Sequence, residues 1–275
     1  METSQTDRPA QLLALHSGDG FVLPNAWDGG SARMLQDVGF PVVATTSAGV
    51  AWSCGVPDGG TLDRDTMLEH VSRIVDAVDV PVTADLEAGY GPAAEDVAQT
   101  AAMAVSVGVV GGNVEDAGAD GLFPMDEAAE RIAAARDAAP RGTFVLNART
   151  DAYFAGISGD PFAETVERAI RYIDAGADCI FVPGVADAAT IQRLAEAIPA
   201  PLNVVAGLAN MLDASTLFSL GAKRVSLGGS IARAAFSLVE RAGRELQETG
   251  TLGFLDGAIG YADMQRRFSV DSARQ

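Results

Sequence analysis

The chain has 275 residues, of which 48% are hydrophobic and 20% are charged, a composition that is ordinary for globular proteins and excludes wholesale disorder. Its formal net charge of −18 argues against nucleic acids and anionic membrane surfaces as partners. If the substrate is an anion, positive charge must therefore be concentrated locally, as arginine or as a metal ion.

Targeting signals and disulfide frameworks are not evident in the sequence. The first twenty residues are polar without an apolar signal core, and no later apolar run approaches the roughly 18 residues of a membrane-spanning helix. The two cysteines, Cys54 and Cys179, provide neither a disulfide framework nor a CxxC metal site. We expect a cytoplasmic protein.

Eight apolar segments rich in β-branched residues are each followed by a longer segment with helical periodicity. In chain order the predicted strands are FVLPNAW (21–27), FPVVATTS (40–47), PVTADLE (81–87), VVGGNVED (109–116), TFVLNARTD (143–151), DCIFVPG (178–184), PLNVVAG (201–207) and KRVSLGG (223–229). They are continuously apolar rather than alternating, which is typical of a parallel sheet covered on its outer face. Eight such units in roughly 250 residues predict an α/β fold of the TIM-type (β/α)8 barrel class.

The barrel is expected at about 20–245 of a single domain, residues 1–275, with an extension of one or two C-terminal helices at about 251–269. A doubly wound open sheet is the alternative architecture. It would normally require a glycine-rich nucleotide fingerprint after the first strand, and NAWDGGS does not match GxGxxG. The sequence therefore favours the barrel.

Acidic residues collect at the carboxyl ends of the second to fourth predicted strands, where TIM barrels build their active sites. Asp85 and Glu87 are two residues apart, so we expect them on the same side of their strand. Glu115 ends the fourth predicted strand, and Asp58 lies in the loop that follows the second. Crowded acids repel one another unless a cation lies among them, and oxygen ligands with retained water suit Mg²⁺. We predict a metal site there; for any single acid, helix capping is the alternative.

Arg149 ends the fifth predicted strand, beside these acids. One interpretation is a structural salt bridge with Glu115 or Asp151. The other is a bidentate clamp on a substrate carboxylate or phosphonate. We favour the clamp, because an acidic protein that binds an anion must place its arginine at the site.

The sequence does not place the residues that several other kinds of catalysis need at the strand ends. The only lysine, Lys223, begins the last strand and so lies at the opposite mouth of the barrel, which excludes Schiff-base chemistry. His16 and His70 lie away from the strand ends. Cys179 begins a strand and is expected in the core, and Cys54 is expected to pack rather than react. Catalysis must then rest on carboxylates, arginine and a metal.

Four motifs occur in a fixed order: TTSAGVAWSCGVPDGG (45–60), VTADLEAGYG (82–91), GGNVEDAG (111–118) and LNARTDAYF (146–154). Together they resemble the isocitrate lyase/phosphoenolpyruvate mutase superfamily, and the resemblance covers most of the chain. It implies a barrel enzyme that depends on Mg²⁺, with Mn²⁺ as an alternative ion. Such enzymes act on small 2-oxo or 2-hydroxy acids and cleave or form C–C or P–C bonds beside an enolate.

The resemblance also implies roles for individual residues. Asp85 is expected as the direct metal ligand within a shell completed by Asp58, Glu87 and Glu115, and Arg149, Asp58 and Glu115 are expected to take part in catalysis. The expected substrate-binding residues are Thr46, Ser47, Ala48, Arg149 and Asn203. A homo-oligomer is implied too, a dimer or tetramer whose C-terminal helices are exchanged between subunits.

The loop after the fourth strand, EDAGADGLFPMDEAAE (115–130), contains no cysteine, lysine or histidine. The lyase branch of the superfamily carries a Lys-Lys-Cys-Gly-His stretch there, and the mutases carry an asparagine and basic residues. Loss of CO₂ from a 2-oxo dicarboxylate needs no such group. We therefore expect a lyase that cleaves a C–C bond next to the 2-oxo group of an oxaloacetate-like acid. The alternatives are a phosphonomutase or phosphonopyruvate hydrolase, and a non-catalytic binding or regulatory barrel.

Overall fold

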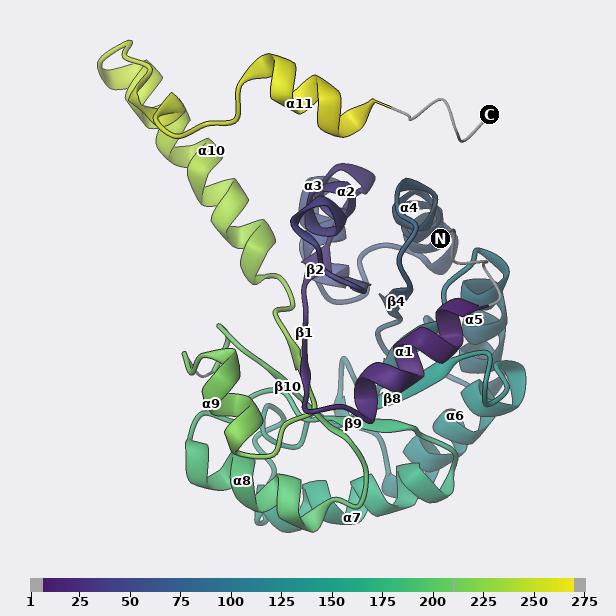
Figure 1. Cartoon of the computed structure of the whole chain (residues 1–275). Coiled ribbons are helices and arrows are strands. Elements are labelled where there is room, and N and C mark those ends of the chain that lie inside the picture. Colours follow the sequence, from purple (N-terminus) through teal and green to yellow (C-terminus); the bar gives the residue numbers. More distant parts are fainter. Residues whose placement is uncertain (1–6, 210, 270–275) are drawn as a thin grey trace.

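The computed structural model describes residues 7–209 and 211–269, and in this part of the chain nine strands form one parallel sheet (Figure 1). The order within the sheet is β1-β11-β10-β9-β8-β5-β4-β3-β2. The strands are β1 (Phe21–Leu23), β2 (Asn25–Ala26), β3 (Val43–Thr45), β4 (Val82–Asp85), β5 (Gly111–Glu115), β8 (Val145–Arg149), β9 (Cys179–Phe181), β10 (Leu202–Val205) and β11 (Arg224–Ser226).

The two ends of this sheet meet at Pro24, which divides one strand into β1 and β2. β1 pairs with β11 and β2 pairs with β3, so the two halves close the sheet into a barrel of eight strands within the described residues. Asn25 fastens this closure: its Nδ2 donates to the carbonyl of Thr45 at 2.7 Å, and its Oδ1 accepts from the amides of Leu227 and Gly228, both at 2.9 Å. The predicted TIM-type barrel is confirmed.

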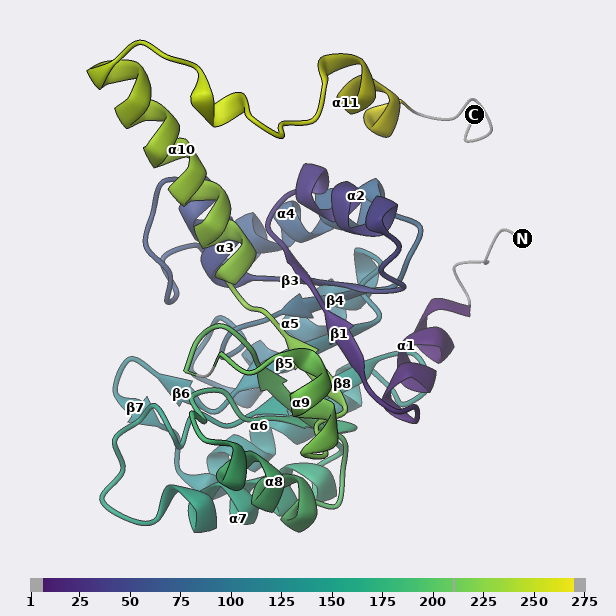
Figure 2. The ribbon, with the colours of Figure 1, turned by 60° about the vertical axis from the view of Figure 1, so that its left-hand side comes forward.

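Helices surround the barrel and return the chain to the start of each next strand (Figures 1 and 2). They are α1 (Arg8–His16), α2 (Gly29–Val38), α3 (Ser47–Ser53), α4 (Arg64–Ala77), α5 (Ala94–Ser106), α6 (Met125–Ala138), α7 (Pro161–Asp174), α8 (Ala188–Ala197), α9 (Ala214–Ser219), α10 (Ser230–Glu248) and α11 (Tyr261–Phe268). Aspartates provide many of their starts: the side chains of Asp63, Asp187 and Asp213 each accept from the amide three residues later. Gly39 ends α2 with a φ of 106°, in the left-handed region that favours glycine.

The amino-terminal mouth of the barrel is closed by α1. Leu12 is fully buried there and packs in one cluster with Phe21 of β1, Val145 of β8 and Val110, which immediately precedes β5. Lys223 lies at this mouth and donates to the carbonyl of Gly18 at 3.0 Å, as its position at the start of the last strand predicted. Because this end is filled by side chains, access to the interior is from the carboxyl ends of the strands.

Several local elements differ from the expectation. Each strand is shorter than predicted, and the loop after β3 contains the helix α3. The loop after β5 forms a small hairpin of β6 (Ala117–Gly118) and β7 (Gly121–Leu122). Turn geometry rather than an apolar pattern decides such short elements, so periodicity does not find them.

The carboxyl-terminal extension leaves the barrel surface. α10 projects outward, and after the 3-10 turn η2 (Gly253–Leu255) the chain returns so that α11 contacts α2 (Figure 1). No helix in the described part of the chain is long and apolar enough to cross a membrane. The first six and last six residues of the predicted single domain lie outside the described residues.

Candidate active site

A cavity of about 330 Å³ opens at the carboxyl ends of the barrel strands. Asp85, Asp58 and Arg149 line it together with the segment Thr45–Ala48 and with Asn203. Side chains from the second, third, fifth and seventh barrel strands, and from the loop after the second, thus meet at one place. Most of the residues predicted for the site are therefore brought together.

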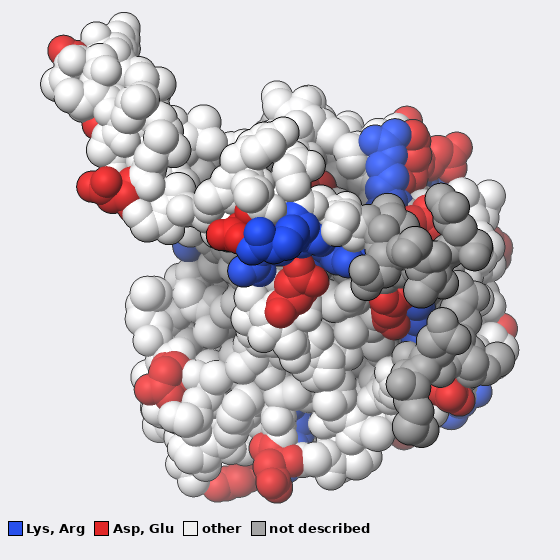
Figure 3. Space-filling model, turned by 45° about the horizontal axis from the view of Figure 1, so that its top comes forward, with Lys and Arg blue, Asp and Glu red and all other residues white. Residues whose placement is uncertain are grey.

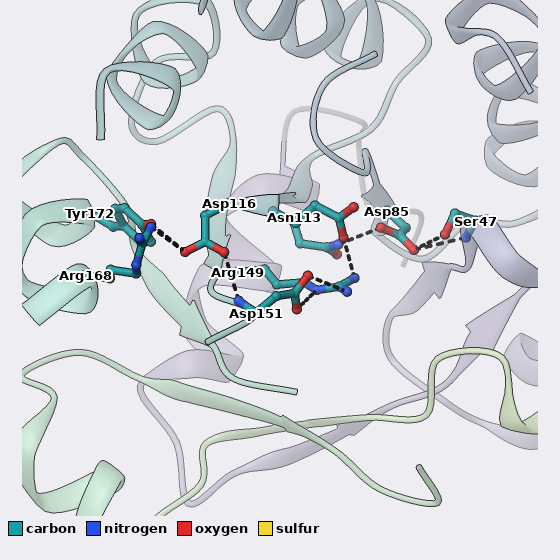
Figure 4. A network of polar contacts seen from close by, with 9 residues as sticks. Ser47, Asp85, Asn113, Asp116, Arg149, Asp151, Arg168 and Tyr172 are labelled. Atoms are coloured by element: carbon teal, nitrogen blue, oxygen red, sulfur yellow. Dashed lines mark hydrogen bonds and ion pairs between the residues drawn. The ribbon is translucent and has the colours of Figure 1, made fainter. Parts of the chain in front are cut away.

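Asp85 is the most firmly held acid of this group (Figure 4). Its Oδ2 accepts from the amide and the hydroxyl of Ser47, at 3.0 and 2.8 Å, and its Oδ1 accepts from Nδ2 of Asn113 at 2.7 Å. Its own amide donates to Oγ1 of Thr45 at 2.9 Å. A carboxylate has about four lone-pair sites, so roughly one remains for a ligand in the cavity.

Glu87 and Glu115 line a neighbouring hollow rather than the central cavity. β4 ends at Asp85, and Glu87 follows in a turn with a φ of 46°, a value uncommon for residues other than glycine. The alternation of a strand therefore stops before Glu87. The expectation that Glu87 and Asp85 lie on the same side of their strand was wrong, because Glu87 is not in the strand. Its Oε1 accepts from the hydroxyl of Tyr90 at 3.2 Å.

The acids nevertheless act on one another. Burial, and then the charges of Asp85 and Asp58, raise the pKa of Glu87 to about 7. Burial raises the pKa of Glu115 to about 8, although the guanidinium of Arg149 acts in the opposite direction. The pKa of Asp58 is raised as well, by desolvation first and by Asp85 among the lesser causes. The four carboxylates thus form one electrostatic group that a cation would stabilise.

The donor set fits a hard cation with few direct protein ligands. Among residues 7–209 and 211–269, no three His, Cys, Asp or Glu side chains converge as a ready-made metal-binding group. Oxygen is the only ligand atom these acids offer, and Mg²⁺ keeps several of its waters in such sites. Asp85 and Asp58 line the central cavity, and Glu87 and Glu115 line the neighbouring hollow. Their assignment as metal ligands stays a prediction.

Arg149 makes both of the ion pairs considered from the sequence. Its Nη1 lies 2.6 Å from Oε2 of Glu115, and its Nε and Nη2 donate to the two oxygens of Asp151 at 2.8 and 2.9 Å (Figure 4). Three of the five N–H donors of the guanidinium are thereby used, which leaves two for a ligand. Its side chain is 22% exposed and lines the cavity.

A buried hydrogen-bond network around Asp116 supports Asp151, the partner of Arg149. Oδ1 of Asp116 accepts from the amide of Asp151 at 2.8 Å, while its Oδ2 accepts from the hydroxyl of Tyr172 at 2.6 Å and from Arg168 at 3.2 Å (Figure 4). Arg168 and Tyr172 belong to α7, so this helix fixes the position of the guanidinium through Asp116 and Asp151.

The residues predicted to bind substrate all line the cavity, but they differ in their free donors. Both the amide and the hydroxyl of Ser47 are directed at Asp85. Thr46 caps α3 with its side chain. Nδ2 of Asn203 donates within the barrel to Ser226 and to the carbonyls of Val204 and Arg224, and its Oδ1 accepts from Asn147. Ser47 and Asn203 therefore organise the cavity, and direct substrate contacts by Thr46, Ser47, Ala48 and Asn203 remain predictions.

Sequence reasoning assigned no role to several polar side chains that line the cavity, among them Asn25, Asn113, Arg224 and Arg233. Asn113 stands two residues before Glu115, and its direct contact with Asp85 could have been inferred from the neighbouring strands. Arg224 is at the start of the last strand, a position assigned to the opposite mouth. Arg233 lies in the first turn of α10 and donates to the carbonyl of Gly207 at 3.0 Å.

The two thiols differ in their environments. Cys179 is fully buried, as predicted, and burial raises its pKa to about 12. The expectation that Cys54 packs against neighbouring elements was wrong, because this residue ends α3 at the surface and is exposed. Its Sγ lies 3.3 Å from Nε2 of His70, and neither residue lines the central cavity.

Comparison with known proteins places this fold and site in a family. The family model "Phosphoenolpyruvate phosphomutase" matches residues 12–247. The 2-methylisocitrate lyase of Escherichia coli is 31% identical over 200 residues, which are 68% of this chain and 64% of that protein.

Solved structures agree with this match. The crystal structure of a protein classed as a lyase/mutase from Burkholderia cenocepacia is 42% identical and superimposes with a TM-score of 0.92, covering 97% of each chain. Oxaloacetate acetylhydrolase, solved with its product oxalate, is 26% identical with a TM-score of 0.88, covering 98% of this chain and 96% of its own.

The chain belongs to the phosphoenolpyruvate phosphomutase family, within the isocitrate lyase/phosphoenolpyruvate mutase superfamily that its motifs indicated. The prediction of an enzyme of the lyase class is confirmed by these relatives.

Proposed function

We propose that the protein is a Mg²⁺-dependent lyase that cleaves the C–C bond next to the 2-oxo group of a small, oxaloacetate-like 2-oxo or 2-hydroxy acid. The observation that carries the proposal is the placement of the Asp85 carboxylate and the Arg149 guanidinium on one cavity of about 330 Å³. A group that binds a cation and a group that binds an anion then face the same small ligand. The named relatives, a 2-methylisocitrate lyase and an oxaloacetate acetylhydrolase, support this substrate class.

Each part of the site has a chemical task. When bound, Mg²⁺ would supply positive charge at the substrate oxygens where negative charge develops as the bond breaks. Asp85 would hold the ion, oriented by Ser47 and Asn113, while Asp58, Glu87 and Glu115 would hold its waters. The two remaining donors of Arg149 would bind a substrate carboxylate. Because Asp151 and Glu115 fix the guanidinium beforehand, little orientational freedom is lost on binding.

Cleavage of a P–C bond is the second candidate function, favoured by the name of the matching family model. A non-catalytic barrel is the third. Against it stands the crowding of four carboxylates, which destabilises the fold unless the site binds a cation.

The deciding experiment is a turnover assay with Mg²⁺ and a panel of 2-oxo acids, malate-type lyase substrates and phosphonopyruvate, with pyruvate release as the readout. We expect turnover of an oxaloacetate-like acid that stops with EDTA and returns with added Mg²⁺. Turnover of phosphonopyruvate alone would favour the P–C chemistry. No turnover with intact Mg²⁺ binding would favour the regulatory barrel or a substrate outside the panel.

Substitution of Asp85 tests the metal part separately. Asp85→Asn should weaken Mg²⁺ binding, measured by calorimetry, by at least tenfold while the protein stays folded. Asp19→Asn is the matched control, because Asp19 is an exposed aspartate at the opposite mouth and its loss changes the net charge equally. Unchanged Mg²⁺ affinity in Asp85→Asn would rule out this residue as a ligand.

An oligomer with exchanged carboxyl-terminal helices is part of the same proposal, as is a cytoplasmic location, which the two free thiols suit. The exposed apolar side chains Phe236, Leu238 and Val239 on α10 support the oligomer, and Figure 3 shows large uncharged areas on this projecting arm. Val239 is 67% exposed and Val38, on α2, is 70% exposed. Light scattering should show that Val239→Asp lowers the oligomeric mass, whereas the control Val38→Asp does not. Equal masses for both variants would exclude α10 from the interface.

A further inference from the structure

Arg224 is a buried arginine whose guanidinium is incompletely paired within the described residues. It points into the barrel from β11, its side chain is 1% exposed, and it lines the central cavity. Its Nε and Nη1 have no hydrogen-bond partner among the described residues. A buried guanidinium in this state is strongly unfavourable, so its retention needs an explanation.

Three other buried arginines in the described part of the chain have most of their donors engaged, whereas Arg8, at the start of α1, shares with Arg224 an Nε without a partner. Arg131 donates to three backbone carbonyls, at Pro92, Ala88 and Gly91. Arg136 donates to carbonyls and to a carboxylate oxygen of Asp178, and Arg168 donates to the carboxylates of Asp116 and Glu164. These contacts neutralise or solvate the charge, and Arg224 has no equivalent.

The surroundings of Arg224 within the described residues are otherwise neutral. The buried thiol of Cys179, on β9, is near enough to affect it, but burial raises the pKa of that thiol to about 12 and keeps it protonated. His16, beneath it on α1, has a pKa lowered to about 4 by burial and by Arg224 itself. The positively charged guanidinium of Arg224 therefore lies at the cavity floor without a negatively charged partner among the described residues.

We propose that Arg224 forms an anion subsite at the floor of the central cavity, which takes the second carboxylate of a small dicarboxylate held at its other end by the Asp85 and Arg149 region. The dicarboxylate part rests on the proposed function; the anion subsite itself does not. A ligand with one carboxylate would leave the guanidinium unpaired. The subsite therefore selects dicarboxylates over monocarboxylates of equal length.

Binding of unreactive acids tests the subsite without any turnover. Calorimetry is run with succinate, with butyrate, which has the same chain length and one carboxylate, and with oxalate in the presence of Mg²⁺. The variant is Arg224→Met, and Lys223→Met is its control, because it removes the same charge from the neighbouring residue at the opposite mouth. Arg224→Met replaces an unpaired buried charge by an apolar side chain and should fold with an equal or higher melting temperature.

We expect the unaltered protein and Lys223→Met to prefer succinate over butyrate by at least tenfold, and Arg224→Met to bind the two within about twofold of each other. Oxalate, with its two carboxyl groups directly bonded, should bind Arg224→Met within about threefold of its normal affinity. A succinate preference that survives in Arg224→Met would overturn the subsite and leave internal water as the partner of Arg224. Should Arg224→Met not fold, Arg224→Lys, which keeps the charge and shortens the reach, must lose at least fivefold of the preference.

The two proposals fail separately. A preference that depends on Arg224 in a protein without lyase turnover upholds the subsite and rejects the proposed reaction. Turnover of an oxaloacetate-like acid with an unchanged preference in Arg224→Met does the reverse.

Discussion

The guanidinium of Arg149 and the carboxylate of Asp151 form two parallel hydrogen bonds, Nε to Oδ1 at 2.8 Å and Nη2 to Oδ2 at 2.9 Å. Arg149 is the last residue of β8 and Asp151 follows it by two positions, so the pair is formed locally, within the wall of the site. It determines which edge of the guanidinium remains available to a ligand. The planar fork is required for this arrangement, and an ammonium group cannot reproduce it.

Arg149→Lys should therefore act as a disruptive substitution. Lysine keeps the charge but loses both the parallel pair with Asp151 and the fork toward the ligand, so kcat/KM for the best substrate should fall by more than tenfold, about 1.4 kcal/mol. Steady-state kinetics with circular dichroism as a check of folding measures this. A smaller loss would mean that Arg149 serves the fold rather than the substrate.

Tyr172→Phe should destabilise the protein through Asp116. The variant removes the 2.6 Å hydrogen bond to a carboxylate that is 3% exposed, and the expected loss is about 1–3 kcal/mol of unfolding free energy. Urea denaturation measures it. Tyr153→Phe is the control, because its buried hydroxyl has no partner among the described residues, and it should change stability little. Equal effects of the two variants would show that the Asp116 contact contributes nothing.

Neither thiol is expected to take part in turnover. Cys54→Ala should keep its kcat, because Cys54 is exposed and outside the central cavity, and thiol alkylation should not inhibit. Cys179→Ala should keep its kcat and lose about 1 kcal/mol of stability through the small hole left in the core. A large loss of turnover in Cys54→Ala, with folding and Mg²⁺ binding preserved, would instead assign the cysteine a proton-transfer role.

His16 should make stability depend on pH. Its pKa is about 4 in the folded protein, against 6.5 for the free side chain, because of burial and the charge of Arg224. The unfolded chain then binds more protons between these values, so the stability is present above pH 6.5 and is lost as the pH falls toward 4. At pH 5 the loss is roughly 2 kcal/mol.

Comparison with His16→Gln isolates this contribution, because glutamine does not titrate and can donate to the carbonyl of Leu12 as the imidazole does. Urea denaturation of both proteins at pH 7.5 and pH 5 should show that their difference in unfolding free energy changes by roughly 2 kcal/mol. A difference that is the same at both pH values would contradict the neutral, buried state of His16.

The barrel could be predicted from the sequence because its eight strands are continuously apolar and each is followed by an amphipathic helix. The position of Asp85 followed from the same pattern, since a strand end in a parallel barrel faces the site. The position of Glu87 could not be predicted in this way, because its left-handed backbone breaks the alternation of the strand and the residue type gives no sign of that conformation. Arg224 was missed for another reason: depth along the barrel axis depends on strand tilt, which the sequence of one strand does not contain.

The hydrogen bonds of Asn25 to Leu227 and Gly228 join positions 202 and 203 residues apart in the chain. Most other contacts of the sheet join consecutive strands, which meet early in folding because short loops cost less entropy to close. The wall of the cavity formed by residues 227–229 is thus completed only when the beginning of the chain reaches its end. During refolding, helical and strand signals should accordingly recover before the ability to bind a ligand. The delay between these two signals measures how long the contacts of Asn25 with Leu227 and Gly228 take to form.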